Sequence, residues 1–363
     1  MDIRSLLARF ADSRYVQDGV LRLTDLHLKA GQPPLYRLDD ALVRLEEDPV
    51  LDAVALSEAI REFVGDERLK ALEQDPRSDI DVGYSGSDET RRDGLSFRVN
   101  VFQDRDGPAV AVRVLPAQVP EVEQLGLAPE VAEQIVSQRH GLLVVTGVTG
   151  SGKSTTVASI LRRIGRERPV RIITLEDPIE YVLDGEQAMV SQRELGTHME
   201  TFHQGLRSAL REDPDIIFVG EMRDQETAAL ALTAAETGHL VLSTMHTRDA
   251  KGAVTRLVDL FPSERSREIS SQLSFGLSWV LAQKLVPRAG GQGRVAAIEV
   301  LKNVPAIGNM IRNGRWHQIY AGIEGHRRDG LITLERRLFE MVEKGLIRSD
   351  DARRFANDPA QLV

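Results

Sequence analysis

The feature that most constrains the fold of this chain is a glycine-rich segment, residues 147–154, which reads Gly-Val-Thr-Gly-Ser-Gly-Lys-Ser. It matches the phosphate-binding loop pattern G-x-x-x-x-G-K-[ST] at every specified position. An apolar run at 142–146 precedes it, as a buried strand would, and residues 155–161 continue as a helix. Strand, glycine loop and helix in this order predict a nucleotide-binding domain, because a glycine-rich turn with an incidental lysine would not account for both flanks.

Each residue type in this loop has a physical reason. Glycines let backbone N–H groups turn toward phosphate oxygens, and the N-terminus of the following helix favours negative charge. Lys153 can reach the outer phosphates of ATP, and the Ser154 hydroxyl is a ligand for Mg²⁺. The residues predicted to bind the nucleotide are Gly147, Thr149, Gly150, Ser151, Gly152, Lys153, Ser154 and Thr155.

Composition excludes several classes of protein. A length of 363 residues favours about two domains. The 46 basic and 55 acidic residues give a net charge of −9, which argues against nucleic acid as a direct partner. Cysteine is absent, so disulfides, cysteine-bound zinc and thiol catalysis are excluded. No apolar run approaches the roughly 20 residues of a transmembrane segment, and charges interrupt the N-terminus, so we expect a soluble protein without a secretion signal.

The first 115 residues are predicted to form a small α+β domain. Short alternating runs indicate an antiparallel sheet, and two helical stretches lie between them, near 52–64 and 66–74. The polar segment 85–94 is expected to be a mobile hairpin loop. Residues 116–128 contain Pro116 and Pro120 and are followed by Pro129, a pattern that indicates a linker. The alternating runs are 35–38, 79–82, 95–102 and 109–114.

Residues 129–363 have a different pattern, in which strands alternate with helices. Near-continuous apolar runs at 170–175, 216–219 and 240–244 are typical of strands covered on both faces. The intervening helices predict a mostly parallel sheet with right-handed crossovers, so the overall class is α/β. From about residue 264 the chain is expected to be mainly helical.

Hydrolysis of a nucleotide needs a group that positions water near the terminal phosphate. Glu221 is the best candidate, because it ends a buried strand on the ligand side of an open α/β sheet. Glu176 and Glu180 follow another strand and could orient water, or in the case of Glu176 reach the metal through water. His246 follows a third strand and could sense the phosphate. Each residue also has an alternative interpretation without a catalytic role. Glu221 could be a solvated turn residue, Glu176 and Glu180 could belong to an acidic loop that caps the strand, and His246 could be structural.

Several motifs occur together in a fixed order. They are Gly147–Thr155, Glu176–Tyr181 (Glu-Asp-Pro-Ile-Glu-Tyr), Ala209–Ile217, Gly220–Asp224 (Gly-Glu-Met-Arg-Asp) and Thr233–His239. This set resembles the secretion ATPase superfamily that powers type II secretion and type IV pili. The likeness covers nearly the whole chain from about residue 24 and is densest over 140–265.

The resemblance implies a fold and a set of roles. It implies a PAS-like α+β N-terminal domain, then a RecA-like P-loop ATPase domain with a helical C-terminal part, assembled as a homohexamer. Glu180 and Glu221 would be the catalytic carboxylates, and His239 and His246 would form a histidine box. Arg98, Arg105 and Arg113, which by themselves are only the polar face of strands, would approach the phosphates as arginine fingers.

Within the superfamily the chain most resembles the pilus retraction ATPases, which lack the cysteine-bound zinc element of other branches. This implies a cytoplasmic motor that acts peripherally at the inner membrane through a pilus platform protein and drives retraction and twitching. Residues 306–313 correspond to the retraction helix A-I-R-N-L-I-R-E, but Gly308 replaces an arginine and Asn313 replaces a glutamate. Gly308 leaves open an accessory retraction paralogue or the ATPase of a related type II secretion or DNA-uptake system. Two further alternatives are a nucleotide-binding scaffold and a nucleic-acid translocase.

Overall fold

The computed structural model describes residues 3–17, 20–39, 41–45, 48, 50–75, 77–85, 95–115, 119–291 and 293–362. Its contacts divide the chain into two compact units. The first unit comprises residues 1–118 with 177–182, and the second comprises residues 119–176 with 183–363. The predicted α/β class, with an α+β unit ahead of a parallel-sheet unit, is confirmed.

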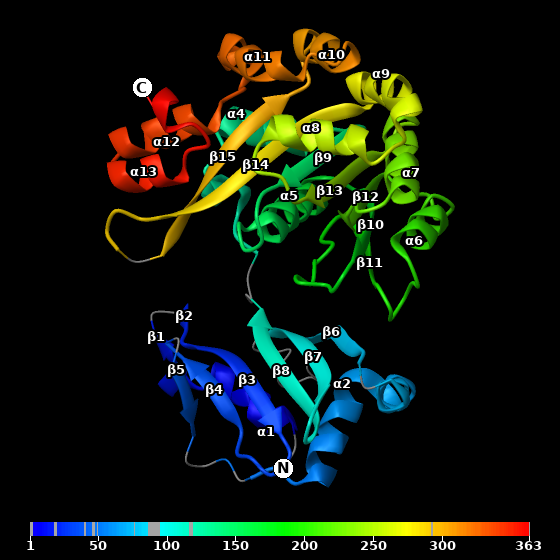
Figure 1. Cartoon of the computed structure of the whole chain (residues 1–363), viewed down its shortest axis with the longest axis vertical. Helices are drawn as coiled ribbons and strands as arrows, with labels where there is room; N and C mark the ends of the chain where they lie inside the picture. Colours follow the sequence, from blue (N-terminus) through cyan, green and yellow to red (C-terminus); the bar gives the residue numbers. More distant parts are fainter. Residues whose placement is uncertain are drawn as a thin grey trace. The chain divides into compact units, whose positions relative to one another are not determined.

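The first unit is built on a six-stranded antiparallel sheet in the order β5-β4-β3-β8-β7-β6, with helices α1 and α2 (Figure 1). Its apolar core includes Leu26, Phe97 and Val112 from the sheet and Ile60 from α2. The two predicted helices are one element broken at Gly65, whose φ of 78° is not helical. The elements are α1 (Ile3–Ala8), β1 (Val16–Gln17), β2 (Val20–Leu21), β3 (Leu23–Lys29), β4 (Leu35–Leu38), β5 (Ala41–Arg44), α2 (Ala53–Gln74), β6 (Asp79–Ser85), β7 (Ser96–Asp104) and β8 (Gly107–Leu115). Of the expected hairpin loop, residues 86–94 lie outside the described residues.

The second unit has a seven-stranded sheet in the order β11-β10-β12-β13-β9-β14-β15, in which only β15 runs antiparallel to its neighbour (Figure 1). Alternate side chains of β9 enter two different cores, as the pleat requires. The first half consists of α4 (Pro129–Val136), β9 (Gly141–Thr146), α5 (Lys153–Glu167), β10 (Arg171–Glu176), β11 (Met189–Glu194), α6 (Phe202–Ala209), β12 (Ile216–Glu221) and α7 (Gln225–Glu236). The second half consists of β13 (Leu240–Met245), α8 (Ala250–Asp259), α9 (Ser266–Gly276), β14 (Leu277–Pro287), β15 (Arg294–Lys302), α10 (Pro305–Arg312), α11 (Ile319–Gly325), α12 (Leu334–Glu343) and α13 (Ser349–Phe355).

The expectation that the chain is mainly helical beyond residue 264 missed β14 and β15. β14 pairs in parallel with β9, the strand that leads into the glycine loop, and β15 pairs antiparallel with β14. Most residues of β14 are buried, so its sequence is a nearly continuous apolar run. Periodicity cannot distinguish such a strand from a buried helix. The sheet therefore extends two strands beyond the glycine loop, and α12 and α13 pack on that extension.

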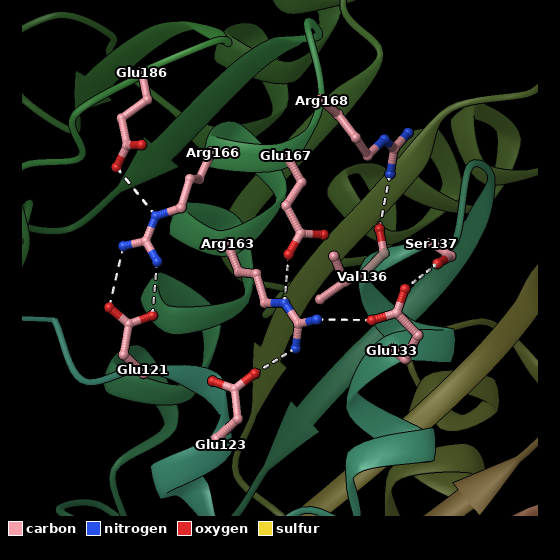
Figure 2. A network of polar contacts seen from close by, with 10 residues as sticks. All are labelled: Glu121, Glu123, Glu133, Val136, Ser137, Arg163, Arg166, Glu167, Arg168 and Glu186. Carbon is pink, nitrogen blue, oxygen red and sulfur yellow. Dashed lines mark hydrogen bonds and ion pairs between the residues drawn. The ribbon is translucent and has the colours of Figure 1, made fainter.

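Residues 119–128, expected within the linker, pack closely against α5. The segment Val122–Leu125 is a short 3-10 helix, and its two end residues are buried in the same core as Ile160 and Ile164 of α5. Arginines of α5 bind this segment through carboxylates, as Figure 2 shows. The ion pairs are Arg163 with Glu123, Glu133 and Glu167, and Arg166 with Glu121 and Glu186. This segment is thus held by both apolar and ionic contacts.

Within the described ranges, no helix combines the length and the apolar character needed to cross a membrane.

Candidate nucleotide site

The glycine loop lies between the end of β9 at Thr146 and the start of α5 at Lys153. Gly147, Gly150 and Gly152 have φ values of 152°, 74° and 85°, a region that residues with a Cβ rarely adopt. Gly152 is the N-cap of α5, so the helix begins directly from a left-handed residue. The loop therefore has the backbone geometry of a phosphate cradle, with helix N–H groups at its end.

Two polar side chains of the loop are buried. Lys153 is 9% exposed, and its Nζ donates to the carbonyl oxygens of Gly147 at 2.9 Å and Val148 at 3.1 Å. Ser151 is also buried, and its Oγ has no hydrogen-bond partner among the described residues. A lysine cation bonded to two carbonyl oxygens of the loop, in a loop that also carries a buried hydroxyl without a partner among the described residues, is an arrangement that suits an anionic ligand.

Glu221 lies at the same level of the sheet as the end of β9. In the strand register, Glu221 pairs with Thr244 of β13, and Thr244 pairs with Val145 of β9. Two strand spacings separate Glu221 from Val145, or about 10 Å between their Cα atoms. The Glu221 side chain is 20% exposed and forms an ion pair with Arg223, whose Nη2 lies 2.8 Å from its Oε2. His246 Nε2 lies 3.6 Å from the same carboxylate, so the structure brings these two predicted site residues together.

Glu176 belongs to the second unit, whereas Glu180 is grouped with the first. Glu176 ends β10, one residue beyond the pairing of Leu175 with Val219 of β12, and so it reaches the same edge as Glu221. It accepts hydrogen bonds from Thr174 Oγ1 at 2.6 Å and from Gln192 Nε2 at 3.0 Å. Glu180 lies in residues 177–182, which are grouped with the first unit.

The two histidines that the resemblance assigned to one box lie at opposite ends of β13. His239 precedes the strand, and its Nδ1 is 3.1 Å from the carbonyl oxygen of Ala234 at the end of α7. His246 follows the strand. The six residues of β13 lie between them, which places their Cα atoms roughly 20 Å apart. His246 thus lies at the sheet edge that carries Glu221, and His239 does not.

Two of the three candidate arginines form a pair. Arg98 on β7 is registered directly opposite Arg113 on β8. Arg98 is bonded to Asp81, whose hydrogen bond raises the pKa of the guanidinium. Arg113 donates to Asp25 at 2.8 Å. Arg105 lies in the turn after β7, seven residues from Arg98 and so roughly 20 Å away along the strand.

Three residues of the site were not found from the sequence. Arg223 contacts Glu221, and Thr247 binds the end of β9 through a 2.8 Å contact between its Oγ1 and that of Thr146. Gln283 of β14 contacts the glycine loop directly. Arg223 was already inside a recognised motif, and Gln283 is a polar residue in an otherwise apolar run, so both carried a signal that the interpretation did not use.

Comparisons with known proteins match this chain along nearly its full length. A family model described as type II/IV secretion system protein matches residues 36–345. The Pseudomonas aeruginosa protein named type IV pilus retractation ATPase PilT is 41% identical over 359 residues, covering 99% of each chain. An Escherichia coli protein named uncharacterized protein YggR is 42% identical over 323 residues, or 89% of this chain and 95% of that one. A crystal structure of the pilus retraction motor PilT with bound ADP matches with a TM-score of 0.87 at 38% identity, covering 100% of this chain and 99% of that one.

Proposed function

This chain belongs to the type II/IV secretion system protein family, and we propose that it is a motor ATPase that drives type IV pilus retraction. The observation that carries the proposal is the common sheet edge on which the glycine loop, Glu176, Glu221 and His246 lie. The two pilus relatives support the mechanical role, since one is named a retractation ATPase and the other is titled a retraction motor with bound ADP.

In this proposal the loop binds the phosphates of ATP. The backbone N–H groups around Gly150 and Gly152 and the Nζ of Lys153 provide the positive field for the phosphates. Glu221 orients a water molecule for attack on the terminal phosphate, and Arg223 and His246 hold its carboxylate in place. Glu180 is proposed as a second carboxylate that joins this site.

The residues at the loop fit a magnesium ion that is held partly by the nucleotide. In the portion of the chain described, no group of three or more histidine, aspartate or glutamate side chains could form a metal cage. Mg²⁺ typically binds through one or two protein oxygens together with phosphates and water. Ser154 in the first turn of α5 would supply a hydroxyl, and Glu176 would act through water. Bound there, Mg²⁺ would neutralise charge on the phosphate oxygens.

We propose that the site is completed in a homohexamer, in which arginines of the first unit stabilise the charge that develops during hydrolysis. Arg98 and Arg113 are suited to act as a pair, and Arg105, which lies too far from them to bind the same phosphate oxygen, would contact a different group. Such a ring would turn a platform protein at the inner membrane.

Substitution of Glu221 by alanine tests the hydrolytic role. The Glu221→Ala protein should bind ATP with an affinity within threefold of wild type, because the loop is intact, while its turnover falls at least a hundredfold. Glu264→Ala, which changes an exposed glutamate in the second unit, is the matched control and should keep its turnover. Turnover of Glu221→Ala close to wild type would remove Glu221 from this role.

A second candidate function is that of an accessory retraction paralogue or the ATPase of a related secretion or DNA-uptake system. Gly308 favours it, because a Cβ at this position would lie 3.0 Å from the carbonyl oxygen of Ser274 and 3.2 Å from Asn303 Oδ1. The arginine of the retraction helix therefore does not fit here without a shift of α10.

Complementation distinguishes the two functions. The gene is expressed in a strain that lacks its retraction ATPase but assembles pili. Restored twitching by this chain alone supports the main proposal. Twitching that returns only when a second retraction ATPase is also present supports the accessory role, and ATP turnover without any effect on pili points to a related system.

A further inference from the structure

We propose that Gln283 is a positioning residue that fixes the orientation of the phosphate-binding loop. The proposal rests on the function proposed above and adds a residue outside the loop motif. Gln283 lies on β14, one residue beyond the pairing of Ala282 with Thr146 at the end of β9. Its side chain therefore projects beside the point where the chain leaves the sheet and enters the loop.

Both polar atoms of the Gln283 side chain are used, although the residue is only 3% exposed. Its Nε2 donates to the carbonyl oxygen of Ser151 at 2.6 Å. Its Oε1 accepts from the Thr156 hydroxyl at 2.7 Å. The orientation of the amide follows from the chemistry, since a carbonyl oxygen can only accept. Gln283 thus connects the loop to the first turn of α5 from a neighbouring strand.

The hydrogen bond to Ser151 fixes one peptide plane of the loop. Because the peptide unit is planar and trans, its C=O and the N–H of the next residue point in opposite directions. With the Ser151 carbonyl directed to Gln283, the N–H of Gly152 is directed away from β14. We infer that this N–H faces the phosphates and that Gln283 holds it there before the nucleotide binds.

Two glycines of the loop lie close to Gln283. A Cβ at Gly152 would lie 2.8 Å from the side-chain Nε2 of Gln283, and a Cβ at Gly147 would overlap the main-chain carbonyl oxygen of Gln283. The close approach of β14 therefore restricts these positions, in addition to the left-handed backbone of Gly152. The loop and Gln283 form one packed arrangement rather than a flexible turn beside a strand.

A purely structural role would give a different result from a positioning role. Gln283→Met keeps the length of the side chain and removes both hydrogen bonds. Thr156→Val removes the hydroxyl at nearly constant shape, and Thr156→Ser restores it. Gln272→Met, on α9, makes the same chemical change away from the loop. Each full-length protein is titrated with Mg-ATP and Mg-ADP, assayed for KM and kcat, and melted without nucleotide.

We expect Gln283→Met and Thr156→Val to raise the Kd and KM for Mg-ATP at least tenfold, while Thr156→Ser stays within threefold of wild type and Gln272→Met is unchanged. Wild-type affinity in both Gln283→Met and Thr156→Val, whatever their melting temperatures, overturns the positioning role. If Gln283→Met does not fold, the affinity of Thr156→Val for Mg-ATP, compared with that of Thr156→Ser, decides whether the positioning role holds. A wild-type chain that binds no nucleotide would instead overturn the proposed function.

Discussion

Arg98 and Arg113 are registered directly opposite each other across β7 and β8, so two guanidinium groups occupy neighbouring positions on one sheet face. Like charges in this position destabilise a sheet. Each arginine is compensated by a carboxylate, Asp81 for Arg98 and Asp25 for Arg113. The two ion pairs therefore offset the repulsion between the guanidinium groups, and the Asp25 carboxylate that holds Arg113 is buried.

Substitution of either arginine should affect turnover more than stability. Arg98→Gln removes a repulsion together with a partly exposed ion pair, so we expect little change in melting temperature. Arg113→Gln also takes a cation from the buried Asp25 carboxylate, so we expect a moderately lower melting temperature. ATP turnover of the assembled protein should fall at least tenfold, because charge stabilisation in the transition state is lost. Arg44→Gln on the exposed strand β5 is the control. Wild-type turnover in both variants would place the arginines outside the catalytic step.

Glu299 should make the second unit less stable as the pH rises. It is fully buried, and burial raises the pKa of its carboxyl to about 7, although backbone N–H groups of Ala250 and Leu334 bind it. The folded state thus holds the proton more tightly than the unfolded state, whose ordinary pKa is 4.5. Stability is lost between about pH 4.5 and 7, by up to about 3 kcal/mol.

Urea unfolding at several pH values checks this, because both tryptophans, Trp279 and Trp316, lie in the second unit and report on it. Glu299→Gln should flatten the pH dependence over this range. The free energy of unfolding is plotted against pH for the wild type and for Glu299→Gln. The difference between these two curves isolates the effect of Glu299 from that of the titratable groups around it, which are Asp249, Glu335, Tyr320 and Lys284. Parallel curves would mean that the carboxyl stays ionised in the folded protein.

The sequence predicts those parts of the site that depend on local order along the chain. The glycine loop needs only a strand before it and a helix after it, and Glu221 needs only to end a buried strand. Gln283 was not predictable in this way, because its contact with Ser151 joins residues 132 positions apart and depends on the place of β14 beside β9. The separation of His239 from His246, in contrast, follows from the strand predicted at 240–244, which lies between them.

Introducing arginine at position 308 should destabilise the second unit. A Cβ there meets the carbonyl oxygen of Ser274 at 3.0 Å, so α10 must move away from α9. We expect Gly308→Arg to lower the free energy of unfolding by about 1–3 kcal/mol. Asn309→Arg, at the next and exposed position, should change it by less than about 0.5 kcal/mol. Tryptophan fluorescence in urea measures both, and equal stabilities would mean that α10 adjusts freely.

The ionic contacts of Arg163 should contribute to stability in a salt-dependent way. Its side chain is 17% exposed and contacts three carboxylates, whereas Arg265 forms an ion pair with Glu268 and lies over the ring of Phe261. Arg163→Met keeps the aliphatic packing and should cost about 1 kcal/mol at low salt, with a smaller loss in 1 M NaCl. Arg265→Met should have a smaller effect. A loss for Arg163→Met that does not change with salt would point to packing instead of charge.

The docking of residues 119–127 on α5 determines where the second unit can be separated from the first. A truncation that starts at residue 129 would delete Val122, Leu125 and Leu127 and leave their apolar binding surface open to water. It would also remove Glu121 and Glu123, which leaves Arg166 and Arg163 with fewer counterions. An autonomous fragment should therefore begin at residue 119 or earlier, and a shorter one should bind hydrophobic dyes and aggregate.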